Sequence, residues 1–285
     1  TGKKVMTSSS SPGISLKMEG ISYIAGAELP CLIVNVVRGG PGLGTIQPSQ
    51  ADYFQATKGG GHGDYHMIVL APSSVQEMAD FVGTGMEMAF KYRNPVMILS
   101  DGLIGQMMEK VELPAQKERV KEFDPSWTIT GKTKERERNI ITSLNLDSEK
   151  QYLHNLKLQE KYESMKEDVM FEKFHCDDAE FLLVAYGSSA RMCQKAVDTA
   201  RSQGKMLGLL RPITLFPFPS AVIAKLARQV KGILTVELSS GQMVEDVRLA
   251  VNGRIPVYYY GTPGGKIFSP DDVLHVIDEK LIGGY

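Results

Sequence analysis

The sequence has few of the residues that metal centres and disulfide frameworks require. It contains three cysteines in 285 residues, Cys31, Cys176 and Cys193, which are widely spaced and odd in number. Their scarcity argues against a zinc or iron–sulfur site in this chain and for a reducing, cytoplasmic compartment. The five histidines show no metal-ligand spacing either.

The sequence also has no excess of positive or negative charge. The 32 lysines and arginines are balanced by 33 aspartates and glutamates, for a net charge of -1. This balance excludes the basic surface that nucleic acid or an anionic membrane would need. Apolar runs are present but too short to span a bilayer. Hydrophobic residues make up 42% of the chain, which is typical of a globular protein.

Strand and helix patterns alternate along most of the chain, which predicts an α/β fold with mostly parallel sheets. A first domain is expected over residues 1–114 and a second, with four strand–helix units, over 178–285. Between them lies a connector, residues 115–177, in which residues 115–175 carry twelve basic and twelve acidic side chains. This composition indicates a solvated connector, with one helix expected over 148–173.

A glycine-rich loop follows the apolar run 31–37, which is predicted as a buried strand. The loop begins with Arg38 and has glycines at 39, 40, 42 and 44. Ligands of parallel α/β sheets bind outside the carboxyl ends of the strands, and a guanidinium suits a carboxylate or phosphate. The alternative is a tight turn whose arginine faces solvent. The loop matches neither the Walker A nor the dinucleotide-binding glycine pattern.

A hydroxyl-rich turn is expected between a strand at 3–6 and a helix at 14–27. It contains Ser8, Ser9, Ser10 and Ser11, and then Pro12 and Gly13. Hydroxyls and free helix N–H groups suit an anion or a polar cofactor ring. The alternative is an ordinary helix cap with a proline in the first turn.

Several other features of the sequence predict local structure. Helices are expected over 48–57 and from Ser74, where Glu77 completes a capping box. Asp101 and Glu237 end predicted strands. Each could contact a ligand, or serve only as a helix cap or a surface charge.

Taken together, the motifs resemble the alpha subunit of 2-oxoacid:ferredoxin oxidoreductases, and most closely the branched-chain (2-oxoisovalerate) enzymes of that family. The resemblance covers nearly the whole chain. The segments that carry it are 7–15, 18–23, 38–41, 48–50, 61–65, 70–77, 186–187, 204–205 and 210–217.

The resemblance implies a pyrimidine-type thiamine diphosphate-binding domain followed by a transketolase C-terminal-like domain. It also implies decarboxylation of a 2-oxoacid on thiamine diphosphate, with electrons passing to ferredoxin and the acyl group to coenzyme A. A beta subunit would hold the diphosphate and magnesium, and the iron–sulfur clusters would lie in partner subunits of the gamma or delta type. A homo- or hetero-oligomer is expected.

In the family pattern, the loop arginine pairs with the substrate carboxylate, a role that falls on Arg38. Members acting on 2-oxoglutarate have Ser-Thr-Gly after Arg-Gly-Gly-Pro, whereas this chain has Gly42-Leu43-Gly44. Leu43 cannot hydrogen-bond a second carboxylate, so it favours an aliphatic substrate. The family's cofactor turn corresponds to Ser8, Ser9, Ser10 and Gly13.

One departure from the family affects activity. The Tyr-Pro-Ile-Thr-Pro motif and the glutamate that activates the cofactor do not occur at the start of this sequence. Glu19 does not match that glutamate's place in the motif. We therefore expect an incomplete alpha subunit that is inert alone. A 2-oxoglutarate enzyme, a non-catalytic assembly subunit, a transketolase-like transferase and a nucleotide-binding protein are the alternatives.

Overall fold

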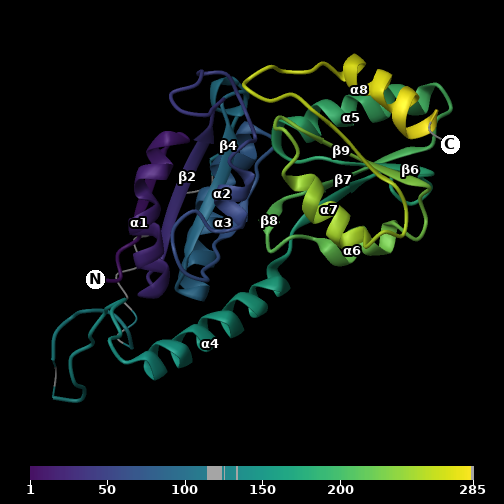
Figure 1. The fold of residues 1–285 in the computed structure, drawn as a ribbon. Coiled ribbons are helices and arrows are strands. Elements are labelled where there is room, and N and C mark those ends of the chain that lie inside the picture. Colours follow the sequence, from purple (N-terminus) through teal and green to yellow (C-terminus); the bar gives the residue numbers. More distant parts are fainter. Residues whose placement is uncertain (114–123, 125, 133, 284–285) are drawn as a thin grey trace.

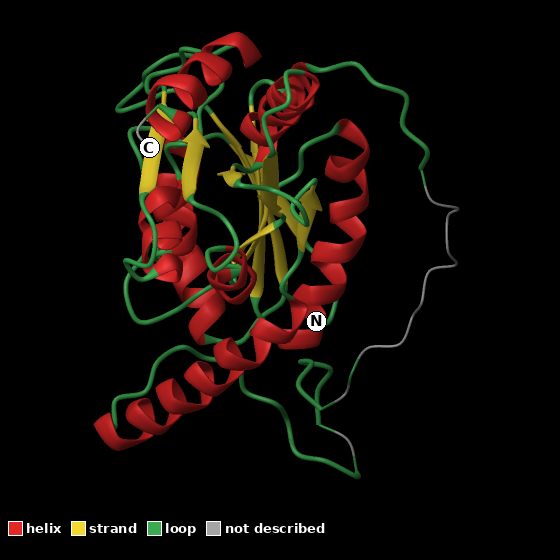
Figure 2. Ribbon diagram, turned by 90° about the vertical axis from the view of Figure 1, so that its right-hand side faces the viewer, coloured by secondary structure: helices red, strands yellow, loops and turns green. Residues whose placement is uncertain are grey.

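Two five-stranded sheets lie side by side, with helices packed on their faces (Figures 1 and 2). They are seen in a computed structural model that describes residues 1–113, 124, 126–132 and 134–283. The predicted boundary at residue 114 and the start of the predicted connector lie outside the described residues. The α/β architecture itself is the one that the alternating pattern predicts.

The first sheet is built around β4, all seven of whose residues are buried. Such a strand is a continuous apolar run because helices cover both faces of a parallel sheet. β1, β2, β3 and β4 run parallel, and β8 is antiparallel to β3. In order across the sheet the strands are β1 (Met6–Ser9), β2 (Cys31–Val37), β4 (Pro95–Asp101), β3 (Ile68–Leu70) and β8 (Thr214–Phe216).

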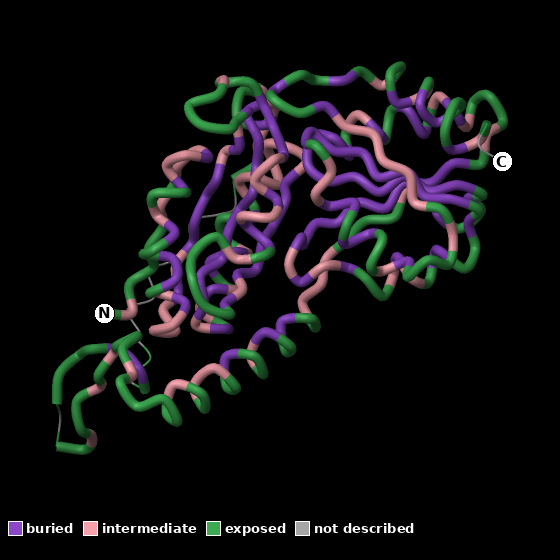
Figure 3. The backbone as a smooth tube through the Cα atoms, in the orientation of Figure 1, coloured by how far each residue is buried: buried purple, intermediate pink, exposed green. Residues whose placement is uncertain are grey.

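The second sheet has the same design, with buried central strands (Figure 3). Four of its strands run parallel, and the edge strand β5 is antiparallel to β7. In order across the sheet the strands are β10 (Val257–Gly261), β9 (Gly232–Glu237), β6 (Phe181–Val184), β7 (Leu207–Pro212) and β5 (Phe171–Phe174).

The helices connect these strands, and none in the described residues combines the length and apolar character of a membrane span. They are α1 (Pro12–Gly26), α2 (Tyr53–Thr57), α3 (Val75–Tyr92), α4 (Ser148–Ser164), α5 (Gly187–Ser202), α6 (Ser220–Leu226), α7 (Met243–Val251) and α8 (Pro270–Val276), with short 3₁₀ turns at Ile104–Gln106 and Met165–Asp168 and a π-helical turn at Ile277–Ile282.

The connector helix is shorter than predicted. α4 begins after Asp147, whose side chain accepts hydrogen bonds from the first-turn N–H groups, and ends at Ser164 instead of residue 173. Residues 171–174 form β5, because pairing with β7 satisfies their backbone groups. α4 runs along the lower edge of the first domain in Figure 1, where Lys161 pairs with Glu28 at 3.3 Å.

Two other boundaries also differ from prediction. The first strand lies at 6–9, not 3–6, so Ser8 and Ser9 are part of the strand and only Ser10 and Ser11 form the turn. The helix predicted over 48–57 is confined to 53–57, because residues 48–50 are extended and pair with other segments.

Gln50 belongs to the first domain, but its side chain forms hydrogen bonds to the second domain. It is 2% exposed, and its amide nitrogen Nε2 donates to the carbonyl of Tyr186 at 2.9 Å. Its Oε1 accepts from the Ser189 hydroxyl at 2.6 Å and from the N–H of Leu238 at 2.8 Å. The segments 48–50 and 186–187, which carry the family resemblance, therefore meet at the domain interface.

Glu77 forms a second link between the domains, and its carboxylate does not complete the predicted capping box. The Ser74 hydroxyl does accept from the N–H of Glu77, at 3.1 Å. The Glu77 carboxylate, however, accepts from the N–H of Ser73 and pairs with Arg211 on β7 of the second sheet. Arg211 also pairs with Glu172 on β5, at 2.9 Å.

Candidate functional site

Arg38 lies where the glycine-loop pattern places it, directly after β2. Its neighbour Val37 is level with Asp101, the last residue of β4, so both strands end at the same edge. This is the carboxyl edge of a parallel sheet, the usual position for a ligand. Arg38 also forms an antiparallel bridge with Pro48, which brings the two ends of the glycine loop together.

The Arg38 guanidinium is engaged with its own loop on one side only. Nη1 donates to the carbonyls of Leu43 and Thr45. A guanidinium has five N–H donors in a planar fork. Among the described residues, Nε and Nη2 of Arg38 have no hydrogen-bond partner, and no carboxylate forms an ion pair with it. The Nε–Nη2 edge can therefore donate two parallel hydrogen bonds to an incoming carboxylate.

The tip of the loop is apolar and open. The Leu43 side chain is 85% exposed and Ile46 is 76% exposed. Gly42 and Gly44 have positive φ, and a Cβ on Gly44 would lie 1.8 Å from the Gly39 carbonyl oxygen. Glycine is thus required for the loop to fold back on itself and present Leu43 outward.

The sequence patterns do not predict the polar network that lies beside Arg38. Ser11 donates its N–H to Asn35 Oδ1 at 3.0 Å and its hydroxyl to Asp52 at 2.8 Å. Asn35 Nδ2 donates to the same Asp52 oxygen at 2.9 Å, and the N–H of Arg38 donates to the Ser11 hydroxyl at 3.1 Å. The one available signal is Asn35, an amide within an otherwise apolar strand that proves fully buried. The network fixes the backbone from which the Arg38 side chain extends.

The predicted cofactor residues lie along the outer edge of the same sheet. Among the described residues, the hydroxyls of Ser8, Ser9 and Ser10 form no hydrogen bond, so they are free for a ligand. Gly13 cannot be larger without moving Ser9, whose Oγ would lie 2.0 Å from an added Cβ. The sequence predicts free N–H groups at the start of this helix, but the N–H of Gly13 donates to the carbonyl of Ser10 at 2.9 Å.

The two strand-end carboxylates are structural. Glu237 is fully buried and accepts from the N–H groups of Met243 and Val244, capping α7. Asp101 accepts from the N–H of Leu103 and from the Ser188 hydroxyl at 2.5 Å. Burial raises the pKa of Asp101, although these donors stabilise its charged form. Both carboxylates are thus occupied by protein donors, and no group of side chains in the described residues is arranged to hold a metal ion.

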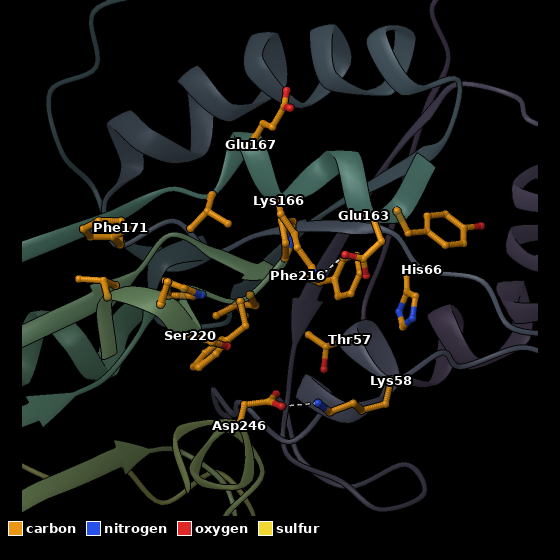
Figure 4. A pocket seen from close by; sticks show the side chains of 18 of the residues that line it. Thr57, Lys58, His66, Glu163, Lys166, Glu167, Phe171, Phe216, Ser220 and Asp246 are labelled. Carbon is orange, nitrogen blue, oxygen red and sulfur yellow. Dashed lines mark hydrogen bonds and ion pairs between the residues drawn. The ribbon is translucent and has the colours of Figure 1, made fainter. Parts of the chain in front are cut away.

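A cavity near the domain interface lies at the opposite edge of the first sheet. It measures about 630 Å³, and Figure 4 shows His66, Phe216 and the Lys58–Asp246 ion pair in its wall. His66 precedes β3, whereas Arg38 follows the parallel strand β2. The cavity is therefore separate from the Arg38 edge.

Comparison with protein families divides the chain into two parts that correspond to the two sheets, except that β5 and β8 each pair with the sheet of the other part. Residues 1–173 match the family described as pyruvate flavodoxin/ferredoxin oxidoreductase, thiamine diphosphate-binding. Residues 179–273 match the pyruvate:ferredoxin oxidoreductase core domain II.

Known relatives agree with these matches. A ketoisovalerate oxidoreductase subunit VorB of Methanothermobacter marburgensis is 51% identical over 98% of this chain and 78% of its own. A 2-oxoglutarate synthase subunit KorA of the same organism is 34% identical, over 97% and 80%. Among solved structures, 2-oxoglutarate:ferredoxin oxidoreductase from Magnetococcus marinus aligns with a TM-score of 0.82 at 24% identity, over 98% of this chain and 54% of that one. A split-gene transketolase aligns at 0.53 and 15% identity, over 88% and 66%.

The fold and the family match together define an α/β protein with a thiamine diphosphate-binding domain, followed by a second domain of the transketolase-like type. The chain belongs to the pyruvate flavodoxin/ferredoxin oxidoreductase family, whose members are 2-oxoacid oxidoreductases. The predicted fold class and family are thereby confirmed. Within the family, the chain is more similar to the ketoisovalerate subunit than to the 2-oxoglutarate subunit.

Proposed function

We propose that this chain is the alpha subunit of a 2-oxoacid:ferredoxin oxidoreductase acting on branched-chain 2-oxoacids such as 2-oxoisovalerate. The observation that carries the proposal is the Arg38 loop. Its guanidinium has a free Nε–Nη2 edge for one carboxylate, and its exposed tip residue is Leu43, which has no group for a second one. The identity of 51% to a ketoisovalerate subunit, against 34% to a 2-oxoglutarate subunit, supports the same substrate class.

In this proposal the edge strand and its turn contact thiamine diphosphate. The free hydroxyls of Ser8, Ser9 and Ser10 fit a polar heteroaromatic ring, which needs donors and acceptors at close range, and Gly13 lets the turn pack against Ser9. The bound cofactor supplies the electron sink for decarboxylation. A companion beta subunit holds its diphosphate with magnesium, and gamma- or delta-type subunits carry the iron–sulfur clusters, ferredoxin and coenzyme A contacts.

The residues of this chain orient the substrate. Arg38 binds the carboxylate through two parallel hydrogen bonds, which fixes the direction of the bond that breaks. Leu43 covers the aliphatic side chain of the substrate and keeps water from it. Burying that apolar surface is worth roughly 1–3 kcal/mol, whereas burying an unpaired carboxylate there would cost more.

Reconstitution tests this proposal. The enzyme that contains this chain, assembled with its companion subunits and thiamine diphosphate, is assayed on a panel of 2-oxoacids with a dye acceptor. We expect 2-oxoisovalerate and its branched-chain analogues to have higher kcat/KM than pyruvate and 2-oxoglutarate. A preference for 2-oxoglutarate would overturn the substrate assignment.

Substituting Leu43 by threonine is expected to shift specificity without affecting the fold. The new hydroxyl can donate to a distal carboxylate, so the 2-oxoglutarate to 2-oxoisovalerate activity ratio should rise about tenfold. Since Leu43 is 85% exposed, the free energy of unfolding should stay within about 0.5 kcal/mol. Ile46→Thr, at a similarly exposed position of the same loop, is the matched control. An unchanged ratio in Leu43→Thr would contradict the role of Leu43.

A further inference from the structure

The second domain contacts the Arg38 loop through the turn between β10 and α8, residues 262–266. In Figure 1 this yellow segment reaches across to the first domain. Thr262 is buried, and its hydroxyl donates to the carbonyl of Lys266, which closes the turn. Gly264 and Gly265 have φ of +70° and +92°, a conformation that only glycine adopts without strain.

The two loops approach each other closely at their glycines. A Cβ on Gly39, the residue after Arg38, would lie 2.9 Å from both the carbonyl carbon and oxygen of Gly264. A Cβ on Gly265 would lie 2.7 Å from Gln47 Cβ and 2.8 Å from Thr45 Cγ2. An added Cβ at either glycine would therefore lie closer to its neighbours than an ordinary contact allows. The two loops can approach this closely only because both positions are glycine.

The residues touched by the turn are those that hold the Arg38 side chain. The N–H of Gly39 donates to the Gln47 carbonyl at 2.9 Å, and the N–H of Thr45 donates to the Gly39 carbonyl at 2.7 Å. Arg38 Nη1 in turn donates to the Thr45 carbonyl at 3.4 Å. Any displacement of Gln47 or Thr45 is therefore transmitted to the guanidinium.

The far end of the loop is held by the second domain as well. Gln50 N–H donates to the Leu238 carbonyl at 2.7 Å, and the Ser49 hydroxyl donates to the same oxygen at 3.2 Å. Leu238 follows β9, the strand beside β10. The Arg38 loop is thus supported from two neighbouring strand ends of a domain that supplies none of the proposed substrate contacts.

We propose that the turn 262–266 is a positioning element for the substrate arginine, so that the second domain sets the KM for the 2-oxoacid through the Gly39–Gly264 and Gly265–Thr45 contacts. The inference rests on the proposed role of Arg38. It assigns to the second domain a function in substrate binding that is additional to its place in the family fold.

Gly265→Ala in the reconstituted enzyme tests the proposal. The new Cβ must displace Thr45 and Gln47, so the KM for 2-oxoisovalerate should rise about tenfold, with kcat and the KM for coenzyme A unchanged. Gly204→Ala is the matched control. Its φ of +81° imposes the same backbone strain, but no atom lies within 4 Å of the added Cβ. Equal KM values for the two variants would overturn the proposal.

A second pair of variants covers the case in which Gly265→Ala does not fold. Thr262→Val removes the hydroxyl that closes the turn and should raise the KM, whereas Thr262→Ser keeps the hydroxyl and should restore it. Arg38→Gln, measured alongside, separates the two hypotheses. If Arg38→Gln leaves the KM unchanged, the role of Arg38 is wrong. If Arg38→Gln raises the KM but the turn variants do not, the positioning role alone is wrong.

Discussion

Arg38→Gln is expected to lower kcat/KM for branched-chain 2-oxoacids by about 10²- to 10³-fold in the reconstituted enzyme. Glutamine cannot form the two-point, charge-assisted contact that the Nε–Nη2 edge offers a carboxylate. It also loses the Nη1 hydrogen bonds to the Leu43 and Thr45 carbonyls, which hold the loop. Steady-state kinetics with 2-oxoisovalerate and a dye acceptor measure the effect.

Two further variants make this result specific. Arg38→Lys keeps the charge but not the fork, so an intermediate loss is expected. Arg228→Gln removes an exposed arginine of the second domain and should leave kcat/KM unchanged. A loss of less than about threefold in Arg38→Gln would be no larger than a single exposed ion pair provides and would remove Arg38 from the site.

Arg211→Met is expected to lower the free energy of unfolding by about 3–5 kcal/mol. Arg211 is 4% exposed and donates from Nη1 to Glu77 at 2.8 Å, from Nη2 to Glu77 at 2.6 Å and from Nε to Glu172 at 2.9 Å. Removing it leaves the Glu77 carboxylate half-buried without its counterion. Denaturant unfolding followed by circular dichroism measures the loss.

The double variant Arg211→Met, Glu77→Met serves as the control for Arg211→Met, because it removes both charges together. It should be less destabilised than Arg211→Met alone, since the unpaired Glu77 carboxylate is gone. A double variant at least as unstable as the single one would show that packing, not charge, is what Arg211 provides.

The same pair predicts how stability depends on pH. Burial acts to raise the pKa of Glu77, but hydrogen bonds from Arg211 and Ser73 outweigh it and leave the pKa below its ordinary value of 4.5. The stabilisation from the charged pair is therefore present above pH 4.5 and is lost as the pH falls through the lower folded pKa. In Arg211→Met, that acid-side loss of stability should be smaller than in the parent.

The strands with continuous apolar runs were predictable from the sequence. β2 occupies the residues expected for it, 31–37, and β9 ends at Glu237 as expected, because a central parallel strand is apolar on both faces. The elements that failed depend on pairing with distant segments. Residues 171–174 extend a helical pattern but pair with β7, and residues 6–9 are polar enough to suggest a turn but pair with β2. Local preference is weaker than a satisfied backbone ladder.

The candidate site divides in the same way. Arg38 and its glycines are neighbours in the sequence, so their position at a strand end could be inferred directly. The support around them could not, because Asn35 and Ser11 are 24 residues apart and Asp52 and Ser11 are 41 apart. Gly264 and Gly265, which contact the Arg38 loop, lie in the other domain altogether. Long-range contacts of this kind leave no periodic or spacing signal in a single sequence.

The crossing of β8 into the first sheet has a consequence for biosynthesis. β3 gains its outer neighbour only when residues 214–216 have left the ribosome, after the entire connector and the first part of the second domain. Until then the nascent chain carries an open strand edge, the feature through which partly made proteins associate wrongly. Dividing the gene between the two domains would prolong the exposure of that edge in the N-terminal product, so continuous synthesis of both halves protects it during maturation.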